Sequence, residues 1–349
     1  MSKSRPVAVI SGGSAGIGFA TAKRLAHEGY DIAILARGKP RLKRATDELK
    51  ALGVETVSHA CDVGDAAAVE RACKAITKRF GTIDVWVNCA MATVFGPFDE
   101  MDDSEFRKVM DTTFMGQVNG TRAALSVMKP NGRGAIVNVG SGLSYRSVPL
   151  QSAYCAAKHA INGFTSAIRS ELIHDGYDDI SISLVQLPAV NTPQFDWARA
   201  KITHKPRPAA PVYQPELAAD GIIKAMESGA REIIVGASAA QLIFGQMAAP
   251  DYLDHKMAEA GWSGQHSDEV LGAPRDGNLM QPVDGDYAAH GSWDHEASRS
   301  GLTIDADVMR RIVFGGGAIL AVGLGAVLGG LAQRGISGMD SDRRRISGR

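Results

Sequence analysis

This sequence lacks an excess of charge of either sign. Its 349 residues include 38 basic and 38 acidic side chains, so the chain as a whole has no electrostatic attraction to nucleic acid. Cysteines are few, at positions 61, 73, 89 and 155, and their spacing does not match a metal site. The amino terminus lacks the pattern of a signal peptide. We therefore expect no nucleic-acid partner, no metal and a location in the reducing cytoplasm.

What the chain does have is a regular alternation of apolar runs and helical patterns between residues 6 and 236, which is typical of βαβ units. The predicted strands are residues 7–10, 31–35, 56–60, 83–87, 135–139, 181–186 and 232–235. We predict an α/β fold with a doubly wound, parallel, Rossmann-type sheet of about seven strands. Ligands of such a sheet bind outside the carboxyl ends of its strands.

The composition changes twice after this region. Residues 261–308 are rich in Gly, Asp, His, Pro and Ser, which predicts a polar linker whose Trp262 and Trp293 are candidates for docking on the core. Residues 309–349 contain an apolar stretch and a basic tail. We predict a catalytic domain over residues 1–260, followed by these two segments.

Residues 312–332 form an uncharged run of 21 residues. At a rise of about 1.5 Å per residue, a helix of this length spans a hydrocarbon core of about 30 Å. Against insertion, the arginines at 343–345 and 349 would have to cross the membrane if the catalytic domain is cytoplasmic. We favour membrane attachment through this segment; a peripheral or re-entrant anchor and a glycine-rich helix buried in an oligomer are the alternatives.

A glycine-rich loop follows the first predicted strand and leads into a predicted helix. Its glycines allow a tight turn and a close approach of backbone amides to a diphosphate at the helix start. The candidate cofactor-binding residues of this loop are Gly12, Ser14, Gly16, Ile17 and Gly18. An ordinary glycine-rich turn is the alternative, but the position between a strand and a helix favours a dinucleotide site.

The end of the second strand indicates which dinucleotide is bound. An NAD site usually has an acidic residue there, and Ala36 cannot accept a hydrogen bond from the ribose 2′-hydroxyl. The next residue, Arg37, offers a cation suited to a 2′-phosphate. We therefore predict NADP(H) rather than NAD(H), with a surface role for Arg37 as the alternative.

Polar residues also end the third and fourth strands, where the adenine and its ribose would lie. Asp62, followed by Val63, is a candidate acceptor for the adenine amino group. Asn88 is a candidate contact to the ribose or, equally, a tie between strands.

Tyr154 and Lys158 are four residues apart and share one face of a predicted helix. An ammonium near a phenol favours the ionised phenol, whose usual pKa is about 10. Ser141 lies at the carboxyl end of the preceding strand. The chain contains a second such pair, Tyr252 and Lys256, but without a serine at the same offset, and we interpret that pair as a solvated helical face.

Together these motifs resemble the classical short-chain dehydrogenase/reductase family, over roughly residues 5–236. The family's Thr-Gly-x-x-x-Gly-x-Gly matches residues 11–18, its Asn-Asn-Ala-Gly residues 88–91, and its Pro-Gly begins at Pro188. The resemblance implies that Pro188 and Thr192 lie beside the nicotinamide. It also places Thr113 where the family has an Asn that holds a water near the catalytic Lys.

The resemblance implies an enzyme that transfers hydride between NADP(H) and a secondary alcohol or ketone, and that assembles as a homo-oligomer. Tyr154 would exchange the proton, Lys158 would lower the pKa of Tyr154 and bind the ribose, and Ser141 would polarise the carbonyl. The aromatic and proline-rich segment 189–215 favours an apolar small-molecule substrate, or merely packs on the core. The alternative function, motivated by Thr113, is a cofactor-binding regulatory or scaffold protein with weak or lost catalysis.

Overall fold

The computed structural model describes residues 5–314. The chain divides into two compact units, Met1–Thr303 and Ile304–Arg349. The first unit therefore includes most of the segment 261–308 that the sequence predicts as a linker. The second begins within a short strand, Thr303–Asp305 (β14), and continues as a helix from residue 306.

The helix predicted over residues 312–332 lies, beyond Phe314, outside the described residues. Within residues 5–314, no helix combines the length and the apolar character needed to cross a membrane.

The first unit is built on a parallel sheet, and all seven predicted strands are confirmed, with boundaries that differ by at most two residues. They are Val7–Ser11 (β1), Asp31–Ala36 (β2), Thr56–Ala60 (β3), Val85–Asn88 (β4), Gly134–Val139 (β6), Ile180–Gln186 (β7) and Glu232–Val235 (β12). Their order is β12-β7-β6-β4-β1-β2-β3, and each of these pairings is parallel. From β1 the chain proceeds to β2 and β3 on one side, and then continues on the other side of β1 with β4, β6, β7 and β12. This change of direction makes the sheet doubly wound and Rossmann-type.

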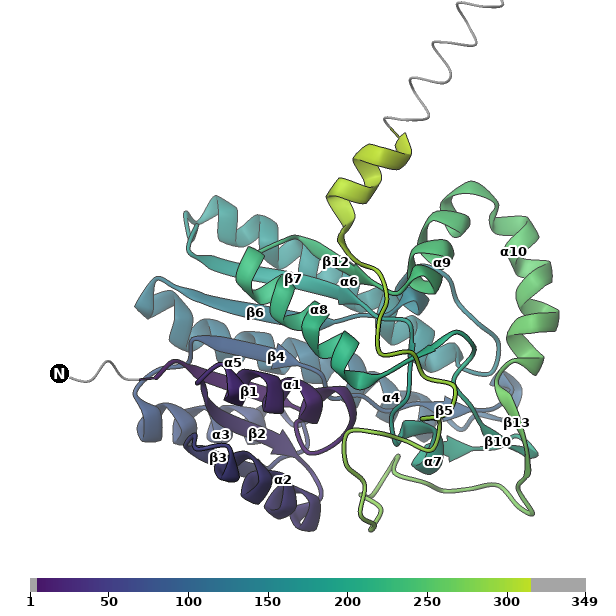
Figure 1. Cartoon of the computed structure of the whole chain (residues 1–349), viewed down its shortest axis with the longest axis horizontal. Helices are drawn as coiled ribbons and strands as arrows, with labels where there is room; N and C mark the ends of the chain where they lie inside the picture. Colours follow the sequence, from purple (N-terminus) through teal and green to yellow (C-terminus); the bar gives the residue numbers. More distant parts are fainter. Residues whose placement is uncertain (1–4, 315–349) are drawn as a thin grey trace, which may run out of the picture. The chain divides into compact units, whose positions relative to one another are not determined.

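Helices cover both faces of the sheet (Figure 1). The helices Gly16–His27 (α1), Lys39–Ala51 (α2) and Pro215–Ser228 (α8) pack on one face, and Ala66–Phe80 (α3), Gly116–Asn131 (α5) and Ser152–His174 (α6) on the other. Along β1, Ala8 and Ile10 belong to one apolar core, whereas Val7 and Val9 belong to the other. Because both faces of each strand are buried, the strands appear in the sequence as continuous apolar runs.

Short elements surround the carboxyl ends of the strands, where the sequence predicts the site. The helices there are Asp103–Met110 (α4), Gln194–Trp197 (α7), Ala237–Ala248 (α9) and Pro250–Lys256 (α10). The strands are Val94–Phe95 (β5), Ala189–Val190 (β8), Arg199–Ala200 (β9), His204–Pro206 (β10), Val212–Tyr213 (β11) and His266–Val270 (β13). None of these six short strands was among those predicted. Strand β13 pairs antiparallel with β10. This pairing attaches the polar segment 261–308, which we call the extension, to the elements around the carboxyl ends of the sheet strands.

Candidate active site

The glycine-rich loop joins β1 to α1 in a conformation that needs glycine. Gly12 has a φ of +73°, and a Cβ atom there would lie 2.8 Å from the Cα of Ala90. A Cβ on Gly18 would collide with the carbonyl oxygen of Gly12. The loop therefore folds tightly at the start of α1, with room for backbone amides to approach a ligand.

This loop forms one wall of a cavity at the carboxyl edge of the sheet. The predicted residues that line it are Gly12, Ser14, Gly16, Ile17, Gly18, Arg37, Asp62, Val63 and Thr192. The ends of β2, β3 and β4 are adjacent in the sheet, which brings these positions together. The cavity is also lined by Trp197, which belongs to the segment 189–215 predicted to face the substrate, and by Asn278, which the sequence reasoning missed because it belongs to no recognised motif.

Two of the predicted cofactor contacts have protein partners. Asp62 forms an ion pair with Lys108 at 2.5 Å and accepts a hydrogen bond from the Gly64 amide at 3.0 Å. Burial acts to raise the pKa of Asp62, but the hydrogen bonds from Lys108 and Gly64 outweigh it and lower the pKa. Arg37 donates to the Leu279 carbonyl oxygen at 2.8 Å and to that of Asn278, and burial lowers the pKa of Arg37.

Asn88 lies away from this cavity, in a buried network between β4, α5 and β6. Its amide donates to Asn138 Oδ1 at 2.8 Å and to Thr121 Oγ1 at 3.2 Å, and its oxygen accepts from Trp86 Nε1 at 2.8 Å. Of its two predicted roles, this geometry matches the tie between strands.

A second cavity of about 430 Å³ adjoins the first and holds the predicted catalytic residues. Ser141, Tyr154, Lys158 and Pro188 all line it, and Ile17 and Thr192 line both cavities. Ser141 follows β6, while Tyr154 and Lys158 lie on α6 with the Lys158 Nζ 5.4 Å from the Tyr154 ring centroid. The volume is within the range of about 300–1,000 Å³ that is usual for small-molecule sites.

Burial dominates the titration of Tyr154 and Lys158. It raises the pKa of the Tyr154 phenol, with a smaller opposing effect from the hydrogen bond to Ser141. The direction is opposite to the lowering expected from Lys158, because burial disfavours the charged phenolate. Burial also lowers the pKa of Lys158 to about 8. Its ammonium donates to the Val139 carbonyl oxygen at 2.7 Å.

Thr113 is fully buried and is hydrogen-bonded to the backbone of Ala92. Its Oγ1 donates to the Ala92 carbonyl oxygen at 2.9 Å and accepts from the Ala92 amide at 3.0 Å. It lies in a π-helical turn, Asp111–Met115. Its single hydroxyl proton is engaged, so Thr113 ties this π-helical turn, which precedes α5, to the segment after β4.

The two residues of the second pair, Tyr252 and Lys256, have different surroundings. Tyr252 is 63% exposed, as a solvated face requires. Lys256, at the end of α10, is exposed but also lines the second cavity, as does the buried Gln265 of the extension. Nothing in the local sequence indicated either position, because α10 and the residue before β13 reach the cavity only through the fold. Within residues 5–314, no cluster of three His, Cys, Asp or Glu side chains could hold a metal ion.

The sequence and the fold of this chain are similar to those of known proteins. The family model described as short chain dehydrogenase matches residues 6–202. The uncharacterized oxidoreductase YxnA of Bacillus subtilis is 33% identical over 264 residues, 75% of this chain and 74% of that protein. A putative ketoacyl reductase of Streptomyces coelicolor is 34% identical over 54% of this chain and 71% of its own length.

A solved alcohol dehydrogenase from Thermococcus sibiricus, complexed with 5-hydroxy-NADP, is 29% identical and has a TM-score of 0.55. It covers 64% of this chain and 91% of its own. The family model ends at residue 202, but both cavities are also lined by later residues: Asn278 lines the first, and Lys256 and Gln265 line the second.

Proposed function

Because this chain belongs to the short-chain dehydrogenase family, we propose that it is an NADP(H)-dependent oxidoreductase acting on a secondary alcohol or ketone. The observation that carries the proposal is that Ser141, Tyr154 and Lys158 line a single cavity that adjoins the one bordered by the glycine loop. A nicotinamide cofactor supplies the hydride in such a reaction. The residues present fit that cofactor, since the loop amides and Arg37 can receive its phosphates.

In the proposed reaction, Tyr154 exchanges a proton with the substrate oxygen. Ser141 donates a hydrogen bond to the same oxygen and stabilises the charge that develops there. Lys158 binds the ribose and favours the ionised phenol. With its pKa lowered to about 8, Lys158 is mainly charged at pH 7, which this role requires.

Preference for NADP(H) is supported by Ala36 and Arg37 at the end of β2 and by the cofactor named for the Thermococcus sibiricus structure. An apolar substrate is supported by the side chains around the second cavity. They include Leu143, Val148, Leu242, Leu253 and Met257. A cytoplasmic location, assembly as a homo-oligomer and membrane attachment through residues 312–332 stay predictions from the sequence.

The test is Tyr154→Phe, with Tyr252→Phe as the matched control. Tyr154→Phe should abolish NADPH-dependent reduction across a panel of ketones, because the proton donor is removed, while NADPH affinity stays within about twofold of the wild type. Tyr252→Phe should change neither quantity. Undiminished turnover by Tyr154→Phe would exclude the assignment. A wild-type protein that binds NADPH but turns over no ketone would favour the regulatory or scaffold alternative.

A further inference from the structure

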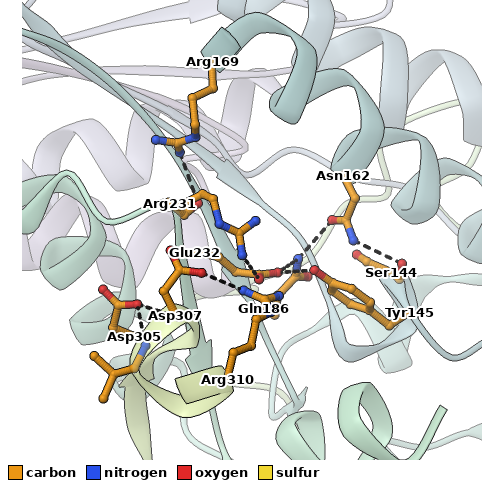
Figure 2. A network of polar contacts seen from close by, with 11 residues as sticks. Ser144, Tyr145, Asn162, Arg169, Gln186, Arg231, Glu232, Asp305, Asp307 and Arg310 are labelled. Carbon is orange, nitrogen blue, oxygen red and sulfur yellow. Dashed lines mark hydrogen bonds and ion pairs between the residues drawn. The ribbon is translucent and has the colours of Figure 1, made fainter. Parts of the chain in front are cut away.

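The loop that carries Ser141 is held by side chains from other elements. Figure 2 shows three of them, Asn162, Gln186 and Glu232, together with Ser144 and Tyr145 of the loop. The Ser141 amide donates to Gln186 Oε1 at 2.8 Å and to Ser144 Oγ at 3.1 Å. Gln186 is fully buried at the end of β7. A Cβ on Gly140 would collide with its amide oxygen, so the loop and Gln186 are in close contact.

The orientation of the Gln186 side-chain amide is fixed by the hydrogen bonds that its nitrogen donates. Its Nε2 donates to Asn162 Oδ1 at 2.9 Å and to Glu232 Oε1 at 2.8 Å, so both amide protons have acceptors. Glu232 is fully buried and also accepts from the Tyr145 hydroxyl at 2.6 Å. A buried network in which the members are satisfied holds its side chains in one arrangement.

The network also joins the serine loop to the helix that carries the catalytic pair. Asn162 follows Tyr154 and Lys158 at the same four-residue interval on α6, so the three side chains share one face. Its Nδ2 donates to the Ser144 carbonyl oxygen at 3.2 Å. The separation between Ser141 and Tyr154 therefore depends on contacts made through Asn162 and Gln186.

We propose that Gln186 and Glu232 are positioning residues that hold Ser141 opposite Tyr154. The inference rests on the proposed function and deepens it. Gln186 holds the Ser141 backbone directly, and Glu232 fixes the amide that does so. A displacement of about 1 Å of a catalytic group can lower a rate about 100-fold, so a network remote from the substrate can control turnover.

The first test is a double-mutant cycle. Gln186→Leu should lower kcat by about 10- to 100-fold while the KM for NADPH stays unchanged. In a Ser141→Ala background the same substitution should have no further effect on kcat, because the group it positions is gone. Ser183→Ala is the matched control: it removes a buried hydrogen bond, to the Ala225 carbonyl oxygen, from the same strand, and it should leave kcat unchanged. Additive losses of Gln186→Leu and Ser141→Ala would overturn the proposal.

The second test needs no turnover. In a Ser141→Cys variant, the rate of alkylation at residue 141, followed by mass spectrometry, should change severalfold when Gln186→Leu is added. Glu232→Gln, which keeps the shape of the side chain, should cause a smaller change in the same direction. Equal alkylation rates in all three proteins would refute positioning. A wild-type protein without any NADPH-dependent turnover would refute the proposed function, but it would not change what the alkylation rates show about the position of residue 141.

An independent observation concerns residues 276–294, which we call the strap. The Ala288 carbonyl oxygen accepts from the amide of Gly16 at 3.0 Å, and strap carbonyls accept from Arg37 and Arg41. Gly16 and Arg37 are the groups proposed for the cofactor's phosphates. The cavity that remains beside them has a volume of about 160 Å³, below the roughly 300 Å³ of a typical ligand site.

At both cations a nearby carboxylate opposes the effect of burial on the pKa but does not outweigh it: Asp62 acts on Arg37, and Asp284 of the strap acts on Arg41. Burial lowers the pKa values of both Arg37 and Arg41, and the neighbouring guanidinium groups contribute to the lowering at Arg41. Their strap partners are neutral backbone carbonyls of Asn278, Leu279 and Val283. A phosphate is a stronger acceptor for a guanidinium than a carbonyl.

We infer that the strap competes with the cofactor's phosphates for Gly16, Arg37 and Arg41, so that NADP(H) enters by displacing it. This second inference also rests on the proposed function. The strap is anchored by the edge contact of Tyr287 with Trp197, whose ring centroids are 4.7 Å apart, and by the hydrogen bond from the Asn278 amide to the Trp197 carbonyl oxygen at 2.8 Å.

Gly277→Ala tests the competition. Gly277 has a φ of +60°, and a Cβ there would collide with the Trp197 carbonyl oxygen, so alanine should push the strap away. Stopped-flow fluorescence should show NADPH associating at least fivefold faster, with tighter binding. Tyr287→Ala should act in the same direction, and Gly272→Ala, where a Cβ meets no atom within 4 Å, is the control. Weaker or unchanged NADPH binding in both strap variants would overturn the inference. Failure of the wild type to bind NADPH or NADH would refute the proposed function instead.

Discussion

Replacing Lys158 with methionine should stabilise the protein at neutral pH while it removes a group proposed for the reaction. Lys158 is 2% exposed, and burial lowers its pKa from 10.5 to about 8. A buried ammonium is therefore maintained at a cost to folding, as is common for groups that serve a site. Methionine fills a similar volume without a charge.

The magnitude follows from the shift in pKa. A difference of about 2.5 units corresponds to about 3 kcal/mol by which the folded state disfavours the charged form. The hydrogen bond from Lys158 to the Val139 carbonyl oxygen is lost, at about 1 kcal/mol, but that oxygen still accepts from Gln117 Nε2 at 2.9 Å. The net gain for Lys158→Met at pH 7 should be about 2 kcal/mol, to order of magnitude.

The sign of the pH dependence is also determined. Below pH 8, Lys158 is charged in both the folded and the unfolded state, so the full penalty for burying the charge, about 3 kcal/mol, applies. Between about pH 8 and 10.5 the unfolded chain binds more protons than the folded one, so the stability of the wild type rises with pH. At pH 9.5 the charge penalty has fallen to about 1.4 kcal/mol, and the advantage of Lys158→Met should be close to zero.

Urea unfolding of the wild type and Lys158→Met at pH 7.0 and 9.5 measures both quantities. Lys78→Met, at an exposed lysine of α3, is the control and should change stability little at either pH. A Lys158→Met protein that is less stable than the wild type by the same amount at both pH values would refute the reasoning.

Three further predictions concern other parts of the site. Arg37→Ala should weaken NADPH binding by about 10- to 100-fold and NADH binding by much less, because only NADPH has a 2′-phosphate for the guanidinium; equal losses measured by fluorescence titration would contradict the NADP(H) assignment. Thr113→Val should lower the free energy of unfolding by about 1–3 kcal/mol in chemical denaturation, because both hydrogen bonds to Ala92 are lost; unchanged stability would show that water replaces them. Cys89 is partly exposed and lines both cavities, yet it should react negligibly with iodoacetamide at pH 7.5, because desolvation raises its pKa to about 12 and the thiolate is the nucleophile; rapid labelling in a mass-spectrometric time course would contradict the raised pKa.

The sequence predicted the sheet well because each strand is buried on both faces. Residues such as Val7, Ala8, Val9 and Ile10 are all buried, half in each core, so the whole run must be apolar. The shorter strands near the site escaped prediction because they consist of two to five residues held by distant partners. In β10, for example, His204 pairs with Val270, and no local pattern records that contact.

The site was predicted where the motif is local and missed where the contact is remote. The spacing of Tyr154 and Lys158 follows directly from the helix, and Ser141 from the end of its strand. The partner of Arg37 lies about 240 residues further along the chain. The same holds for Lys256, whose place beside the second cavity depends on how α10 folds back.

By itself, the sequence determined the doubly wound sheet, the glycine-rich loop and the placement of Ser141, Tyr154 and Lys158, the residues proposed for catalysis, at one sheet edge. These features depend on periodicity, on the steric needs of Gly12 and Gly18, and on the rule that parallel strands end at a common edge. Only the tertiary structure decided the direction of the Tyr154 pKa shift, the hydrogen-bond network that holds the Ser141 amide, and the hydrogen bonds from Arg37 to the strap. Each of these depends on burial and on hydrogen bonds between distant segments, and such contacts become defined only when the chain has folded.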